Sequence, residues 1–169
     1  MITTLEDFYE EVKPLVSSFA LFMEKYGLKD IAKPDHLCYK CVSQEEYEQM
    51  KPLFDFESDY VYQSIISERR IAIVRLKKSI DTPFGPLGFL ELSDQKKDGS
   101  QKSGFDHIEI YPVKGTYLEL IQKIENQGAE IKKVVRPHHT THDIEIESGF
   151  LIRLEEEPLE DKIKREEMK

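Results

Sequence analysis

Two stretches of the sequence, PDHLCY at residues 34–39 and FDHIEIY at residues 105–111, carry the same Asp-His pair followed by alternating side chains. This alternation predicts a β-strand at each position, because successive side chains on a strand point to opposite faces of the sheet. The two stretches lie about 70 residues apart, a spacing that indicates a duplicated structural unit. We therefore predict two related modules, each beginning with a histidine-bearing strand.

Similar elements follow both histidine-bearing strands. A helix-prone stretch comes first, at residues 43–54 in one half and 116–128 in the other, and Ser43 with Glu46 forms a capping box. Three strand-like runs complete each half, at residues 60–67, 70–76 and 87–92, and at residues 130–136, 141–146 and 150–155. Each half is thus predicted to be a βαβββ module, and the chain to belong to the α+β class.

The remaining segments divide the chain around these modules. We expect an N-terminal helical segment at residues 1–30, where apolar residues recur at helical spacing and Pro14 can split the helix in two. The first module spans residues 31–95, a polar linker residues 96–104, and the second module residues 105–158. The charged tail at residues 159–169 is expected to form a short solvated helix or a frayed end.

Composition restricts the partners of the protein. The net charge of −9 argues against nucleic acid, because phosphate binding requires a basic surface. No apolar run approaches the roughly 18–20 residues that a membrane helix requires, and the acidic N-terminus resembles no export signal. Cys38 and Cys41 are too few for a disulfide framework, and we interpret both as reduced thiols that mainly serve packing. The sequence therefore predicts a cytoplasmic monomer or homodimer with no membrane partner.

Strand alternation predicts that each histidine faces away from an apolar surface. His36 and Cys38 point to one side of their strand, whereas Leu37 points to the other. In the second module His107 and Glu109 share a side in the same way. An apolar face suits helices packed outside the sheet, so the histidines are expected on the opposite, mixed face.

This mixed face offers a candidate metal site. If the first and last strands of each module lie side by side, four side chains meet there: His36, Glu91, His107 and Glu155. Two neutral imidazoles and two carboxylates suit zinc, manganese, iron(II), cobalt or nickel better than calcium, and the ligand types do not choose among these metals. Alternatively, both histidines are structural, and the protein is an interaction module with a charged tail.

The repeated module is similar to that of the vicinal oxygen chelate superfamily, which includes glyoxalase I, extradiol dioxygenases and bleomycin-resistance proteins. More narrowly, the YecM-like branch resembles four segments of the chain: DHLCYKC (35–41), RRIAIVRL (69–76), FLEL (89–92) and GFDHIEI (104–110). The resemblance implies a cup-shaped mixed sheet with helices outside and one divalent metal held by His36, Glu91, His107 and Glu155. Relatives of the YecM type carry His at the last of these positions, so Glu155 leaves the identity of the metal open.

The same resemblance implies an isomerase, lyase or oxygenase whose small, oxygen-rich substrate chelates the metal, without indicating which reaction occurs. Glu91 or Glu155 is the candidate general base. Arg153, which shares a face with Glu155, is a candidate substrate-binding residue, together with Tyr111 and Glu109 on the face of His107. The alternative is a non-catalytic module of the same fold that binds a small ligand.

A histidine cluster in the second module consists of His138, His139 and His142. Adjacent side chains on an extended chain diverge, although His142 can reach one of the other two across a loop. A second metal site is one interpretation; a pocket rim or plain loop is the favoured one.

Overall fold

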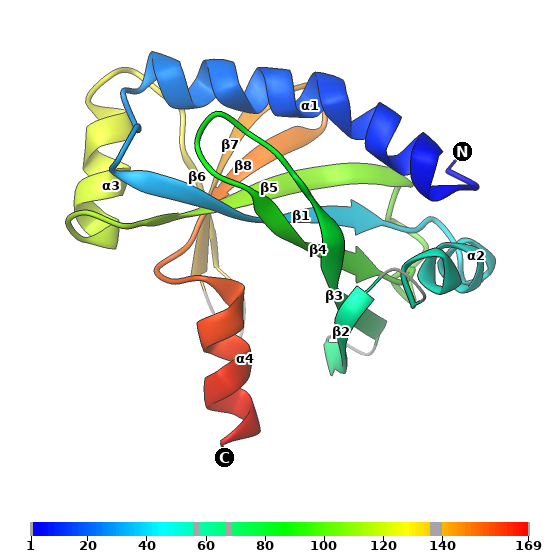
Figure 1. The fold of residues 1–169 in the computed structure, drawn as a ribbon. Helices are drawn as coiled ribbons and strands as arrows, with labels where there is room; N and C mark the ends of the chain where they lie inside the picture. The colour runs from blue at the N-terminus through cyan, green and yellow to red at the C-terminus, as the bar shows by residue number, and fades with distance from the viewer. Residues whose placement is uncertain (1, 56–57, 67–68, 136–139, 169) are drawn as a thin grey trace.

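The computed structural model of the chain consists of four helices and eight strands over the residues it describes, 2–55, 58–66, 69–135 and 140–168 (Figure 1). The helices are α1 (Leu5–Lys25), α2 (Gln44–Asp55), α3 (Tyr117–Glu125) and α4 (Leu159–Glu167). The strands are β1 (Ala32–Lys40), β2 (Ser58–Ile66), β3 (Arg69–Ile80), β4 (Leu87–Ser93), β5 (Gly104–Pro112), β6 (Lys132–Val135), β7 (Thr140–Glu147) and β8 (Phe150–Leu154). The α+β class predicted from the sequence is confirmed, as is a helix ahead of the first strand.

All of these strands belong to one open, mixed sheet in the order β2-β3-β4-β1-β5-β8-β7-β6. In each half the first and last strands are parallel neighbours, β1 with β4 and β5 with β8. The halves join at the centre of the sheet, where β1 and β5 run antiparallel. The strand order of one half therefore mirrors that of the other, and the two histidine-bearing strands lie side by side.

The two faces of the sheet are covered differently. On β3, Ala72 and Val74 belong to the main apolar core, whereas Ile71 and Ile73 pack in a small separate cluster with Ile163 of α4. Figure 1 shows α1 across one side of the sheet and α4 descending from the other. We call the face that carries Ile71 and Ile73 the α4 face, and the opposite one the core face.

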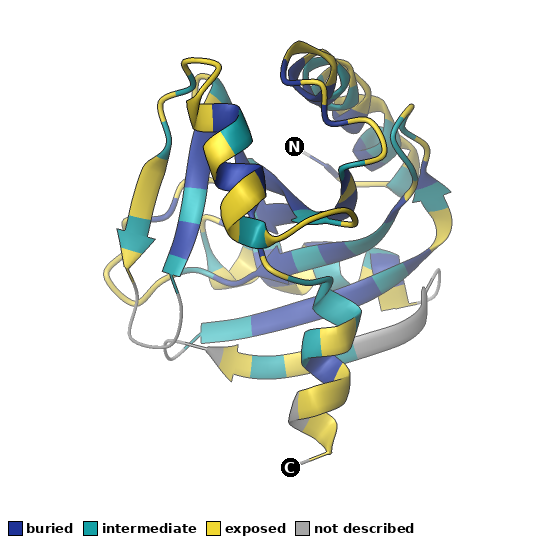
Figure 2. Cartoon of the chain, turned by 90° about the vertical axis from the view of Figure 1, so that its left-hand side faces the viewer, coloured by how far each residue is buried: buried dark blue, intermediate teal, exposed yellow. Residues whose placement is uncertain are grey.

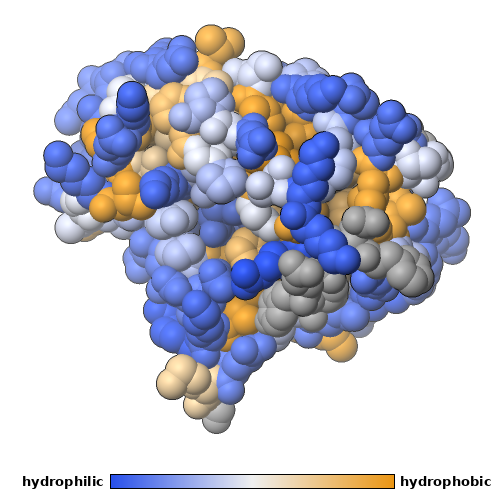
Figure 3. Space-filling model, viewed as in Figure 1, coloured by the Kyte–Doolittle hydropathy of each residue, from blue (hydrophilic) through white to orange (hydrophobic). Residues whose placement is uncertain are grey.

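Helix α1 covers the core face and runs unbroken through Pro14, so the alternative of two separate helices is wrong. An internal proline destabilises a helix by about 3 kcal/mol, but each large apolar side chain buried contributes about 1.5–3 kcal/mol. The side chains buried along α1 are Phe8, Val12, Phe19, Phe22 and Met23. Phe8 meets Phe54 of α2 edge-on, with ring centroids 5.0 Å apart. The outward side of α1 is mainly hydrophilic (Figure 3).

Burial is greatest along the central strands, and most of β6 at the edge is exposed (Figure 2). The segment between β4 and β5 was predicted as a polar linker. The buried side chain of Gln101 holds this segment against the sheet. Its side-chain amide donates to the carbonyl oxygens of Cys41, at 2.7 Å, and Asp94, at 2.9 Å. Cys41 directly follows β1 and Asp94 directly follows β4, so Gln101 ties the linker to the ends of two central strands.

Candidate metal centre

Potential metal ligands come into register at the centre of the α4 face. In the backbone pairing, Cys38 of β1 lies between Glu91 of β4 and His107 of β5. His36 precedes Cys38 by two residues and Glu109 follows His107 by two, so both share this face with them. The adjacency of β4, β1 and β5 therefore assembles one polar cluster from both halves of the chain.

Two sets of three ligand atoms in this cluster lie within 4.8 Å of one another and could hold a metal ion. One set comes from His36, His107 and Glu109, and the other from Cys38, Asp106 and His107. The imidazole centroids of His36 and His107 are 5.8 Å apart, and each residue is 1 % exposed. The two sets share His107 and therefore adjoin each other.

The aspartate that precedes each histidine orients its imidazole ring. The Nδ1 atom of His36 lies 2.8 Å from the carboxylate of Asp35, and that of His107 lies 2.8 Å from Asp106. A carboxylate on one ring nitrogen fixes the tautomer and, at His36, leaves Nε2 available for a metal. This role of the aspartates was not predicted from the sequence, where its signal is the Asp-His pair present in both repeats.

His36 supplies the strongest indication that the cluster suits a cation. Within the described part of the chain, no hydrogen-bond partner reaches its buried Nε2 atom, which lies 3.8 Å from carboxylate oxygens of both Glu91 and Glu109. Burial by itself lowers the pKa of His36, but the negative charges of Glu109, Asp35 and Glu91 outweigh it and raise the pKa to about 9. The same negative charges would also stabilise a divalent metal bound to this buried nitrogen.

His107 is held in the opposite protonation state. Burial and the neighbouring Arg153 guanidinium lower its pKa to about 4, against the opposing effect of Asp106 and Glu91. One guanidinium nitrogen of Arg153 lies 3.2 Å from each ring nitrogen of His107, while two others donate to Asp143 at 2.8 and 2.9 Å. His107 is therefore a neutral imidazole, the form that binds metals.

Glu109 and Glu91 differ in their surroundings. Burial raises the pKa of Glu109 to about 7, with His36 and Lys162 opposing the rise. Burial also acts to raise the pKa of Glu91, but His36, His107 and Arg153 more than compensate and hold it below its usual value. The side chain of Glu91 is 25 % exposed against 7 % for Glu109, so Glu91 is the ionised and more accessible carboxylate.

Like Glu91, the predicted ligand Glu155 lies outside both donor sets. Its carboxylate accepts a hydrogen bond from Lys162 of α4 at 2.7 Å, and the same ammonium lies 3.6 Å from Glu109. The substrate-binding candidate Tyr111 lies two residues beyond Glu109 on β5, opposite Lys33. Of the predicted site residues, the structure brings together His36, Glu91, His107, Glu109 and Arg153, whereas Glu155 pairs with Lys162.

Helix α4 packs over one edge of this cluster rather than extending into solvent on all sides. Its first backbone N–H, at Leu159, donates to the Asp35 carboxylate at 3.0 Å. Ile163 is buried against the α4 face, and Glu160 pairs with Arg75 of β3 at 2.8 Å. The expected helix forms, but one of its sides is docked.

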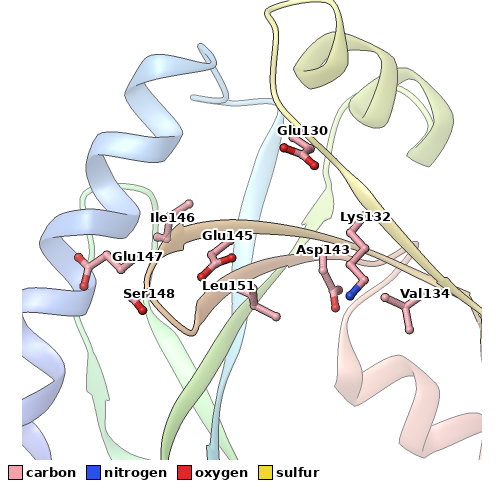
Figure 4. A pocket seen from close by; sticks show the side chains of 9 residues that line it. All are labelled: Glu130, Lys132, Val134, Asp143, Glu145, Ile146, Glu147, Ser148 and Leu151. Carbon is pink, nitrogen blue, oxygen red and sulfur yellow. The ribbon is translucent and has the colours of Figure 1, made fainter.

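A cavity of about 590 Å³ opens on the second half of the sheet (Figure 4). Its lining comes from β6, β7, β8 and adjacent turns: Glu130, Lys132, Val134, Asp143, Glu145, Ile146, Glu147, Ser148 and Leu151. Leu151 is the strand partner of His107, and Asp143 holds Arg153. The cavity therefore adjoins the candidate metal centre through these two residues.

The histidine cluster of the second module is described only in part, because His138 and His139 lie outside the described residues. The Nδ1 atom of His142 lies 2.8 Å from the hydroxyl of Tyr117, which also donates to the carbonyl oxygen of Leu154. This contact ties α3 to the sheet, and gives His142 a structural partner.

Fold and site together define a class: an α+β protein whose duplicated halves share one sheet and hold a buried histidine–carboxylate cluster at their junction. A family model described as "YecM protein" matches residues 1–162, and the chain belongs to this family. A solved structure described as "Structural Genomics, Protein EC4020" is similar over 98 % of each chain, with a TM-score of 0.76 and 16 % identity, which shows a shared fold. A comparison with curated proteins found no match. None of the described helices has the length and apolar character needed to cross a membrane.

Proposed function

We propose that this protein binds one divalent transition metal through His36, His107 and Glu109, with Glu91 as a further ligand. The observation that carries the proposal is the buried Nε2 atom of His36, which lacks a hydrogen-bond partner within the described structure and lies 3.8 Å from two carboxylates. Zinc, manganese, nickel, cobalt and iron(II) all accept imidazole and carboxylate ligands.

The proposed activity is that of a vicinal oxygen chelate enzyme, an isomerase, lyase or oxygenase acting on a small, oxygen-rich molecule. A bound metal would polarise the substrate oxygens that chelate it. Glu91 is the candidate base, because it is ionised, partly exposed and beside His36. Glu155 is a weaker candidate because Lys162 holds its carboxylate. Arg153, beside His107, would orient an anionic group of the substrate.

A non-catalytic module that binds a small ligand is the second candidate. One observation favours it: Lys162 neutralises Glu155 and approaches Glu109, so the cluster has a cation of its own. The cavity beside Arg153 would then be the ligand site, with the two histidines serving as structural residues.

A measurement of bound metal distinguishes the metal centre from the non-catalytic ligand-binding module. Untagged protein should be analysed for bound elements beside a His36→Gln, His107→Gln double variant, with His142→Gln as the matched control outside the cluster. Near-stoichiometric metal that is lost only in the double variant supports the metal centre. If the wild-type protein holds no metal and takes up none of zinc, manganese, nickel, cobalt or iron(II), the metal proposal is wrong and the ligand-binding module is favoured.

A further inference from the structure

Cys38 occupies the middle of the polar cluster, at a position where packing does not account for it. The two cysteines of the chain are both buried, but Cys41 belongs to the main apolar core, whereas Cys38 belongs to neither apolar cluster of the described residues. Cys38 instead pairs across the sheet with Glu91 on one side and His107 on the other. Its neighbours are therefore the proposed metal ligands.

The thiol of Cys38 is within reach of a metal held by these neighbours. Its sulfur lies within 4.8 Å of a ring nitrogen of His107 and a carboxylate oxygen of Asp106, and it donates to Glu91 at 3.4 Å. The buried Nε2 atom of His36, two residues earlier on the same face of β1, lacks a hydrogen-bond partner among the described residues and independently indicates a ligand on this part of the sheet. A metal here would face sulfur as well as nitrogen and oxygen.

We propose that Cys38 binds the metal as a thiolate; this inference rests on the proposed metal centre and deepens it. The metal–sulfur bond forms as the S–H bond breaks, the proton passes to the Glu91 carboxylate and from this partly exposed group to solvent, and no electron is transferred. Thiolate ligands favour zinc, cobalt and iron(II) over manganese, so the proposal also narrows the range of metals. Cys41, on the core face, takes no part.

Cobalt(II) provides the test, because its spectrum reports sulfur ligands separately from binding. The metal-free protein should be titrated with cobalt(II) under argon, with a phosphine reductant in place of added thiols. Visible ligand-field bands report binding, and a near-ultraviolet band reports sulfur-to-cobalt charge transfer. Wild-type protein and the Cys41→Ser control are expected to show both. Cys38→Ser is expected to lose the charge-transfer band and to bind cobalt at least about tenfold more weakly.

The Cys41→Ser variant keeps the test decisive even if Cys38→Ser does not fold. The chain has two cysteines, so a charge-transfer band in Cys41→Ser can arise only from Cys38. Ligand-field bands without a charge-transfer band would overturn the thiolate proposal and leave the metal centre intact. A charge-transfer band that persists in Cys38→Ser would also overturn it. The absence of any cobalt binding would overturn both proposals together.

Discussion

The ammonium group of Lys162 lies 3.6 Å from the carboxylate of Glu109, so a helix at the end of the chain brings a positive charge to the centre of the sheet. The same ammonium forms a 2.7 Å ion pair with Glu155. Opposite charges near a carboxylate stabilise its ionised form, and a cation that occupies this space repels a second one. Lys162 and a metal ion are therefore expected to compete for Glu109.

Replacing Lys162 should strengthen metal binding. In Lys162→Met the repulsion of a neighbouring charge disappears, which we expect to raise zinc affinity by roughly fivefold, or about 1 kcal/mol at a partly exposed site. Competition with a chromogenic chelator measures the affinity. Lys164→Met, on an exposed side of the same helix, is the control and should leave it unchanged. An unaltered affinity in Lys162→Met would show that the lysine and the metal do not share Glu109.

Asp106→Asn should weaken metal binding without removing a ligand of the first donor set. Asp106 fixes His107 through its Nδ1 atom, and loss of such a partner typically costs 10- to 100-fold in metal affinity, so about that loss is expected here. The variant also breaks the ion pair with Lys40, so Lys40→Met serves as the matched control for that contact. Equal losses in both variants would assign the effect to the ion pair instead of to the histidine.

The metal-free protein should lose stability as the pH rises from 7 to 9. The pKa of His36 is raised to about 9 in the folded state from an ordinary value of 6.5, so the folded state binds more protons in this range. Its stabilising contribution is complete below about pH 6.5 and disappears as the pH passes 9, with a slope of at most about 1.4 kcal/mol per pH unit for one proton. The pKa of Glu109 is raised to about 7, so this group adds a further loss of stability as the pH rises towards 7.

Urea unfolding in the presence of a chelator measures this slope. His107, whose pKa is lowered to about 4, acts in the opposite direction below pH 6.5 and does not interfere between pH 7 and 9. The variant His36→Gln lacks the titrating group and is expected to flatten the profile in that window. A wild-type profile that is already flat from pH 7 to 9 would contradict the prediction.

Strand alternation was enough to predict the faces of the sheet, because a period of two depends only on the backbone. It placed His36 and Cys38 opposite Leu37, and Leu37 indeed lies in the main core. Alternation does not predict the register, that is, which residues of two neighbouring strands lie opposite each other. The β1–β5 pairing shifts register between Pro34 and Leu37, and such shifts depend on local twist that no side-chain pattern reveals.

The ligand set illustrates this limit. Glu155 shares the predicted face, but it directly follows β8, one strand beyond β5, where Lys162 binds it. Glu109, expected only to contact substrate, lies on β5 itself and belongs to the donor set with both histidines. The docking of α4 was equally difficult to predict, because the sequence of this segment is almost entirely charged and its apolar contact comes from the buried Ile163 with the partly buried Leu159. The four-ligand set therefore remains a prediction, and of its members only His36 and His107 belong to a donor set.

Ile163→Ala should loosen α4 while leaving the sheet folded. Ile163 packs against Ile71 and Ile73 in a cluster separate from the main core, so the lost contact affects local stability first. We expect a local cost of roughly 2 kcal/mol, the lower end for removing a buried isoleucine side chain. Hydrogen exchange should then accelerate by roughly 30-fold at α4 amides, the equivalent of that free energy, with amides of β1 and β5 unchanged. Uniform acceleration throughout the sheet would instead mean that α4 unfolds only with the whole molecule.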